Sequence, residues 1–426
     1  MKTTAVAAAV LGAVCARGVT GAPEGGPLWN GVAAAWLDSP GGSLEFAVET
    51  GGKPGFALVR NADEAIEVPL VLNDRGELVI RFEEYDSEIV AAPVGENGLE
   101  FRGEWTKRRG PAGDAREWVK MPFFLNARGY CPVEADRGGA DRTMGQLVRT
   151  GRWSVKFADD PEPAVLVMSA ERVPDGRAGV RLTRATFLTT TGDYRYLTPK
   201  VGAGTLSMSC FDGSHAFLFS AKVAEDGSLT GDFWSGPSYH TTWTATPDLN
   251  AALPDGFGTA KVVPGADINA LSYPDAKGEA RSLGEPALVG KARIIEVFGT
   301  WCPNCRDASK ALETLQAKYG GRGLKVVGLA FEVTGDRERD LKQLRVYAER
   351  LGVTYPLLLA GTNDKAKARE AFPVLEKIGA YPTLLFVDAA GRVRRTYSGF
   401  NGPATGAAHT EMMGRFETLI EKMLAE

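Results

Sequence analysis

The feature that most constrains this chain is a pair of cysteines, Cys302 and Cys305, that lies between an apolar segment and a stretch of helical periodicity. The apolar segment, residues 294–298, is typical of a buried strand, and residues 305–319 repeat their apolar side chains at helical spacing. We therefore expect the pair at the N-terminus of a helix. Free backbone N–H groups and the helix dipole favour a thiolate over a thiol there, which predicts a reactive dithiol at Cys302.

Two cysteines at this spacing can also be half of a zinc site or a structural bridge. A zinc site needs about four ligands. The remaining cysteine and histidine residues that could complete one show no second pair at metal spacing: Cys131, Cys210, His215, His240 and His409. We expect no metal and no other cofactor, and redox chemistry at the pair.

Around the pair the sequence resembles the thioredoxin-like superfamily, most closely its TlpA and ResA branch of extracytoplasmic thiol-disulfide oxidoreductases. The resemblance is carried by Trp301 to Cys305, by Tyr381 to Thr383 before the apolar run 384–387, and by a hairpin at 388–391. It covers about residues 262–426. It implies an α/β thioredoxin-like domain with an extra helix and strand between the central strand and the proline loop.

The resemblance also implies roles for individual residues. In that family the proline that matches Pro382 follows a cis peptide bond and lies against the active-site sulfurs, which leaves the adjacent backbone free for an extended substrate. Pro303 and Asn304, between the two cysteines, are expected to tune the reduction potential. Four residues are expected to bind substrate: Trp301, Tyr381, Pro382 and Thr383.

Glu296 lies in the apolar segment six residues before Cys302, where thioredoxin carries an aspartate that moves protons to the second cysteine. A carboxyl buried there is expected to have a raised pKa, which suits acid-base catalysis near neutral pH. ResA-like proteins carry a glutamate three residues after the second cysteine, where this chain has Ala308, so Glu296 is expected to replace it. The alternative is a glutamate that reaches solvent at a sheet edge.

The chemistry of the pair predicts a protein disulfide oxidoreductase in which Cys302 forms a mixed disulfide that Cys305 resolves. Whether it acts as reductant or oxidant stays open. A peroxiredoxin-like peroxidase is the nearest enzymatic alternative, but the positions seven and three before Cys302 are Ile295 and Gly299, so the peroxide pocket lacks its parts. A different class is a scaffold or redox sensor with a thioredoxin-like module.

Length and charge place further bounds on the chain. Its 426 residues suit two or three domains. The net charge of −4, with scattered basic residues, gives no footprint for nucleic acid. The expected partners are client proteins with disulfides or thiols and a membrane-bound thiol protein that donates electrons, with association to the cell envelope as a possibility.

The N-terminus has the pattern of a secretory signal. Lys2 precedes an apolar stretch from Ala5 to Ala16 that is too short to span a bilayer, and cleavage after Ala16 or Ala22 fits the small-residue rule. A lipid anchor at Cys15 is the less favoured alternative. Export also fits Cys131 and Cys210, which either form a bridge or are two buried free thiols. We expect residues 1–22 to be a signal peptide and the protein to be periplasmic or otherwise extracytoplasmic.

Before the thioredoxin-like region, residues 28–247 alternate apolar and polar side chains, which is typical of half-buried antiparallel strands. The chain is therefore expected to be multidomain, mostly antiparallel β followed by α/β. A break in composition divides a β-rich domain, 23–116, from an antiparallel β domain, 117–247, and a linker, 248–264, precedes the thioredoxin-like domain, 265–426. Aromatic clusters at 211–219 and 232–243 suit either a ligand surface or the sheet core.

Overall fold

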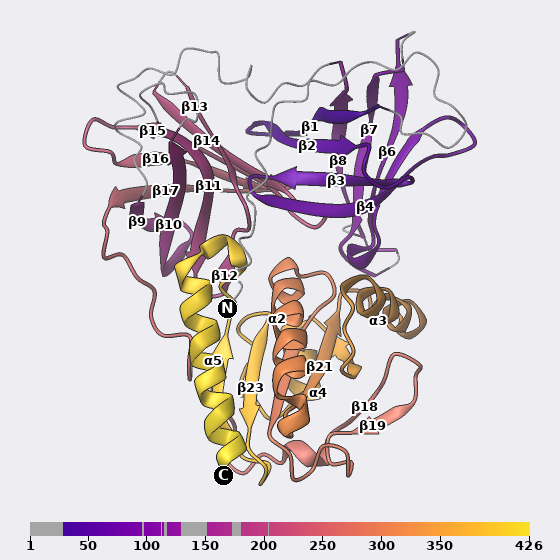
Figure 1. The fold of residues 1–426 in the computed structure, drawn as a ribbon, viewed down its shortest axis with the longest axis vertical. Coiled ribbons are helices and arrows are strands. Elements are labelled where there is room, and N and C mark those ends of the chain that lie inside the picture. The colour runs from indigo at the N-terminus through magenta and orange to yellow at the C-terminus, as the bar shows by residue number, and fades with distance from the viewer. Residues whose placement is uncertain are drawn as a thin grey trace, which may run out of the picture.

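The computed structural model describes residues 29–95, 98–111, 113–114, 117–128, 151–172, 180–202 and 204–426. These residues form three domains, called the three bodies below: a closed β-barrel, a curved antiparallel sheet beside it, and an α/β domain that lies below both in Figure 1. The expected signal peptide, residues 1–22, and Cys131 lie outside the described residues. Of the described helices, none combines the length and the apolar character that a membrane span requires.

The barrel is built from eight antiparallel strands in chain order, and strands such as β1 and β2 bury alternate side chains. Strand β8 pairs with both β7 and β1, which closes the barrel. The expected domain boundary between residues 116 and 117 therefore falls between β7 and β8, two paired strands of one barrel. The reason is that the barrel closes only when β8 pairs with β1. The strands are β1 (Gly31–Ser39), β2 (Gly42–Thr50), β3 (Phe56–Asn61), β4 (Glu64–Leu72), β5 (Leu78–Phe82), β6 (Ser87–Val94), β7 (Glu100–Arg108) and β8 (Trp118–Asn126), with the 3-10 turn η1 (Glu83–Tyr85) between β5 and β6.

The second β domain is a nine-stranded sheet in the order β12-β11-β10-β9-β17-β16-β15-β14-β13. Its far ends approach each other, since Ala185 of β11 and Leu197 exchange backbone hydrogen bonds of 2.9 Å. The clustered aromatic residues lie mainly in its core, where Phe219 stacks on Phe187 and Phe233 at 4.3 and 4.1 Å. The strands are β9 (Gly151–Phe157), β10 (Asp160–Arg172), β11 (Val180–Thr189), β12 (Gly192–Asp193), β13 (Thr198–Gly202), β14 (Thr205–Phe211), β15 (Ala216–Val223), β16 (Leu229–Ser235) and β17 (Tyr239–Pro247).

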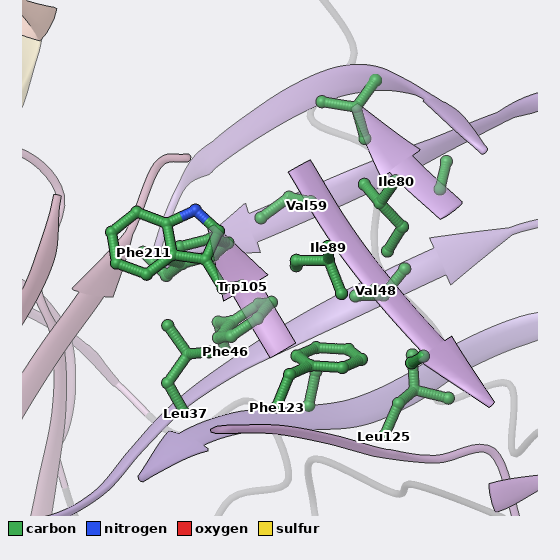
Figure 2. Packing of buried hydrophobic residues seen from close by; sticks show 14 of the residues in the cluster. Leu37, Phe46, Val48, Val59, Ile80, Ile89, Trp105, Phe123, Leu125 and Phe211 are labelled. Carbon is green, nitrogen blue, oxygen red and sulfur yellow. The ribbon is translucent and has the colours of Figure 1, made fainter. Parts of the chain in front are cut away.

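Phe211, the last residue of β14, belongs to the core of the barrel rather than to the core of its own sheet. Its ring lies 4.6 Å from the ring of Phe46 and meets the ring of Trp105 edge-on at 5.3 Å (Figure 2). It also meets the ring of Phe82 edge-on at 5.4 Å. Asn61 fixes this residue further, because its side chain exchanges two 2.8 Å hydrogen bonds with the Phe211 backbone. The core of the barrel is therefore shared with the second β domain, which also has a separate apolar core of its own.

The C-terminal domain has a five-stranded sheet in the order β22-β21-β20-β23-β24, in which β20, β21 and β22 are parallel, β23 is antiparallel to β20, and β24 is antiparallel to β23. Helices α2, α3 and α5 pack against one face, and α4 packs against the other. The elements are η3 (Ile268–Ala270), β18 (Ser272–Pro274), β19 (Ala280–Ser282), β20 (Arg293–Phe298), α2 (Pro303–Tyr319), η4 (Gly320–Arg322), β21 (Lys325–Glu332), α3 (Arg337–Leu351), β22 (Leu357–Thr362), α4 (Lys365–Ala371), β23 (Thr383–Val387), β24 (Val393–Ser398), η5 (Pro403–Thr405) and α5 (Ala407–Ala425).

Residues 248–264, expected to be a linker, are packed in their second half against the C-terminal domain. Phe257 pairs with Tyr397, and Val262 pairs with Leu375, through isolated β-bridges. The Phe257 ring also meets Phe416 of α5 edge-on at 5.8 Å. The physical reason is that Phe257 and Val262 cover apolar surface of this domain, so the segment from about residue 256 onward belongs to it.

Truncation of Phe211 tests the shared core. We expect Phe211→Ala to lower the free energy of unfolding by about 3–5 kcal/mol, because a fully buried aromatic ring leaves a cavity where the two β domains meet. The measurement is urea denaturation of the full chain. Phe124→Ala, which removes a half-buried ring stacked on Trp36, is the matched control and should cost much less. Equal losses in the two variants would show that the shared core is unimportant.

Candidate active site

The C-x-x-C pair occupies the junction between the central strand β20 and helix α2. Cys302 is the N-cap residue of α2, and its sulfur accepts a 3.2 Å hydrogen bond from the backbone N–H of Cys305. Both cysteines are free thiols, so the structure holds the dithiol form. Cys302 is 7% exposed and Cys305 is fully buried, so only the first sulfur is accessible to a substrate.

The loop before β23 lies against the first sulfur. Tyr381 and Pro382 are joined by a cis peptide bond, as the family resemblance implies. The thiol of Cys302 donates to the Tyr381 carbonyl at 3.5 Å, and the ring of Trp301 meets the ring of Tyr381 edge-on at 5.4 Å. Thr383 is buried, and its hydroxyl donates to the Ala380 carbonyl at 2.8 Å, so it holds the loop rather than facing a substrate.

Glu296 lies in the middle of the sheet and is fully buried. Its carboxyl accepts hydrogen bonds from Ser309 at 3.0 and 3.1 Å and from Tyr355 at 3.0 Å. Burial raises its pKa to about 8, although these hydrogen bonds act in the opposite direction. The alternative of a glutamate that reaches solvent at a sheet edge does not apply, because β20 lies between β21 and β23.

Burial also raises the pKa of the Cys305 thiol well above its ordinary value. The neighbouring Cys302 sulfur and the charge of Glu296 act in the same direction. The second cysteine is therefore held as a thiol until a base removes its proton, and Glu296 is close enough to affect that step electrostatically.

A second buried carboxyl, Glu332 at the end of β21, was missed by sequence reasoning. It accepts hydrogen bonds from the backbone N–H and the hydroxyl of Thr300 at 2.9 and 2.8 Å, and Arg339 lies 3.4 Å away. Burial raises the pKa of Glu332 to about 7. It fixes the turn that leads into Trp301. Its only sequence signal is an acidic residue that follows a buried strand.

The β domains cover the C-x-x-C segment, which no sequence pattern indicated. The Ser214 hydroxyl donates to the Trp301 carbonyl at 2.8 Å, and the Asn304 amide donates to the Asp193 carbonyl at 3.1 Å. Gly192 also lies against this segment. A Cβ atom there would come within 2.0 Å of the Asn304 side chain, and its φ of +143° favours glycine. Asn304 and Trp301 are thus interdomain contacts.

Arg195 joins all three bodies beneath this contact. Its buried guanidinium pairs with Asp307 of α2, with Glu64 of the barrel at 2.6 Å, and with Asp212 of its own domain at 3.5 Å. It also donates to the Pro303 carbonyl at 3.5 Å. Burial alone would lower the pKa of Arg195, but these carboxylates raise it above the ordinary value. The guanidinium therefore stays charged.

Of the other described residues considered from sequence, His215 lies 3.5 Å from Asp212, a partner of Arg195, and so borders this centre. The rest lie outside it. His240 pairs with Asp232 at 2.9 Å on the surface, and the His409 ring contacts the Asn401 carbonyl at 2.8 Å. Cys210 is a buried free thiol. Within the described ranges, no group of three or more His, Cys, Asp or Glu side chains is arranged to hold a metal ion.

Comparisons with known proteins concern the C-terminal domain. A sequence profile described as the AhpC/TSA family matches residues 264–396. The thioredoxin-like protein YneN of Bacillus subtilis (strain 168) is 30% identical over 129 residues, which cover 30% of this chain and 68% of YneN. The thiol-disulfide oxidoreductase ResA of Geobacillus kaustophilus is 26% identical over 125 residues, which cover 29% of this chain and 63% of ResA.

A solved thiol:disulfide interchange protein of the thioredoxin family from Chlorobium tepidum TLS aligns with 38% of this chain and 99% of its own, at 24% identity and a TM-score of 0.29. The region 264–396 matched by the AhpC/TSA profile contains the C-x-x-C pair, the buried Glu296 and the proline loop. Through its C-terminal domain, the chain belongs to the thioredoxin-like thiol-disulfide oxidoreductases.

Proposed function

We propose that the protein is an exported reductase of disulfides in client proteins, with Cys302 as the nucleophile and Cys305 as the resolving cysteine. The observation that carries this proposal is the difference between the two sulfurs. Cys302 caps α2 and keeps 7% of its surface exposed, whereas Cys305, three residues further on in the first turn of the helix, is fully buried and donates its backbone N–H to the Cys302 sulfur. Such a pair suits attack on a substrate disulfide followed by internal resolution.

The reaction then proceeds in two exchanges. The Cys302 thiolate attacks one substrate sulfur, the substrate S–S bond breaks, and one thiolate leaves. Cys305 loses its proton and attacks the Cys302 sulfur, which releases the second substrate thiolate and leaves a Cys302–Cys305 disulfide. Two electrons pass to the substrate. Glu296 takes the Cys305 proton as a carboxylate and returns it when the pair is reduced again.

The proposals on export and on the electron donor are supported by the N-terminal sequence pattern and by the resemblance to extracytoplasmic thiol-disulfide oxidoreductases. The proposed signal peptide, residues 1–22, would direct the protein to the periplasm or to another extracytoplasmic compartment, where client disulfides form. A membrane-bound thiol protein is the proposed electron donor, and the β domains are proposed to contact a client or the envelope. Pro303 and Asn304 are proposed to set the reduction potential.

A peroxiredoxin-like peroxidase is the second candidate, because the AhpC/TSA profile matches residues 264–396. The site argues against it. Position 299 is a glycine, and the nearby Thr300 hydroxyl donates to Glu332 rather than facing Cys302. Hydrogen peroxide should therefore oxidise the dithiol no faster than it oxidises an ordinary exposed thiol.

Trapping separates an enzyme from a scaffold or redox sensor. We expect Cys305→Ser to accumulate a mixed disulfide between Cys302 and insulin, because the resolving thiol is missing. Non-reducing electrophoresis followed by mass spectrometry measures the adduct. Cys302→Ser should form none, and Cys210→Ser, which removes a buried free thiol elsewhere, should behave as the unmodified protein. An adduct that persists in Cys302→Ser would refute the assignment of the nucleophile.

Replacement of Glu296 tests the proton step. Since the pKa of Glu296 is raised to about 8, the carboxylate fraction grows between about pH 7 and 9, and the resolution rate of the unmodified protein should rise over that range. Glu296→Gln should slow resolution about 10²-fold and remove this rise. Stopped-flow Trp fluorescence of mixed-disulfide decay measures both. An unchanged pH profile in the variant would contradict the role.

The same substitution has a stability signature with a definite sign. The folded-state pKa of Glu296 is raised, so its contribution to stability is present below pH 4.5 and is lost as pH rises through about 8. Glu296→Gln should therefore gain thermal stability relative to the unmodified protein as pH rises over this window. Glu332 is a second buried carboxyl, with a pKa of about 7, and Glu332→Gln is the matched control. This variant should leave the pH dependence of the resolution rate in place. Loss of thermal stability in Glu296→Gln at high pH would contradict the raised pKa.

A further inference from the structure

A pocket of about 590 Å³ opens where the three bodies meet the C-x-x-C segment. Trp301 and Asn304, on either side of Cys302 in the sequence, both line it. The barrel contributes Lys107 and Arg109, and the second β domain contributes aromatic side chains such as Phe217. The β domains bind the Trp301 carbonyl, the Pro303 carbonyl and the Asn304 amide, so the pocket borders the residues that flank Cys302.

Lys107 is connected to the redox motif through one residue. Its ammonium group donates to the carbonyl and the hydroxyl of Ser214 at 3.0 and 2.6 Å, and that hydroxyl donates to the Trp301 carbonyl. A lysine has three N–H donors, so one remains for a ligand. Burial lowers the pKa of Lys107 to about 8, while the charges of Asp212 and Cys302 act in the opposite direction. The side chain is therefore largely cationic at neutral pH.

The charge that the pocket offers is positive. Arg108 is paired with Asp86 and Glu117, but among the described residues neither Lys107 nor Arg109 forms an ion pair with a carboxylate. The acidic residue that lines the pocket, Asp193, accepts hydrogen bonds from the backbone N–H groups of Gly402 and Arg195 at 2.7 and 3.0 Å. Its charge is thus engaged by the protein, whereas Lys107 and Arg109 remain available to an anion.

We propose that this pocket is a binding site for disulfides flanked by carboxylates, in which Lys107 and Arg109 hold the carboxylate while Cys302 attacks the adjacent sulfur. The proposal deepens the reductase function and rests on it. The same chemistry occurs in a small anionic disulfide and in an acidic cysteine segment of a protein. The dithiol supplies both electrons: the substrate S–S bond breaks, the Cys302–Cys305 bond forms, and two substrate thiols are released with the two protons of the pair.

Single-turnover oxidation of the reduced full chain tests this selection. The probes are three disulfides with the same two-carbon arms: cystamine, which is doubly positive, bis(2-hydroxyethyl) disulfide, which is neutral, and dithiodipropionate, which is doubly negative. The rate for each disulfide is divided by the rate at which free dithiothreitol reduces the same disulfide, which corrects for the intrinsic reactivity of the three probes. We expect the dianion to react about tenfold faster than the dication, and this ratio to shrink at about 1 M salt.

Variants locate the selection in the pocket. Lys107→Met and Arg109→Met should each lower the ratio of anion to cation rates, and Lys107→Arg should keep it. Arg109 is exposed, so its variant remains informative if Lys107→Met does not fold. Lys222→Met removes an exposed lysine outside the pocket lining and should leave the ratio unchanged. A ratio that Lys107→Met and Arg109→Met leave intact would overturn the proposal.

The remaining outcomes separate this inference from the function on which it rests. If all three disulfides react at the same normalised rate, the pocket does not select anions and the reductase function stands. If none oxidises the pair, the reductase function fails, and the inference fails with it. Short peptide disulfides with acidic or basic flanks identify the source: faster reaction of the acidic peptide supports a protein segment, and selection confined to dithiodipropionate supports a small molecule.

Discussion

A single buried guanidinium, that of Arg195, holds the three bodies of this protein together at the redox centre. It pairs with Asp307 in the second turn of α2, with Glu64 of the barrel and with Asp212 of its own domain. Charges removed from water this completely are tolerated only when they are paired, and removal of one partner from such a cluster costs about 3–5 kcal/mol. The position of the β domains over the C-x-x-C segment is therefore fixed by charge as well as by apolar packing.

This arrangement changes what the thioredoxin-like domain presents to a substrate. In the isolated C-terminal domain, Trp301 and Asn304 would border open solvent, but here Ser214 and Asp193 bind them. The residues on either side of Cys302 in the sequence, Trp301 and Asn304, border a pocket whose other walls come mostly from the two β domains. The β region thus contributes to the chemistry of the site through access and charge, even though it has no redox motif.

The local part of the site could be predicted because it is encoded over short distances. The apolar residues of 305–319 recur at helical spacing, and Ala308, Leu312, Leu315 and Tyr319 are buried along α2 as that spacing requires. The burial of Glu296 follows from its place within a continuous apolar strand. The boundary between residues 116 and 117 shows the limit of such reasoning. Turn-rich composition marked a loop there, but it gave no information on which strands the loop connects.

The contacts between bodies had no local signal. Arg195, Ser214 and Lys107 are ordinary polar residues in sequence, and the partners that they bind in other domains lie 87 or more positions away. Glu332 was missed for a related reason, since its partner Thr300 belongs to another strand's loop.

The sequence by itself therefore determined the α/β thioredoxin-like domain, the dithiol at the start of its helix and the antiparallel character of the preceding region. These properties depend on periodicity and on residues that are close in the chain. Only the tertiary structure decided that eight strands close into one barrel, that Phe211 fills it from the neighbouring domain, and that both β domains cover the redox motif. Such features depend on long-range pairing and on buried charges, which composition and spacing do not encode.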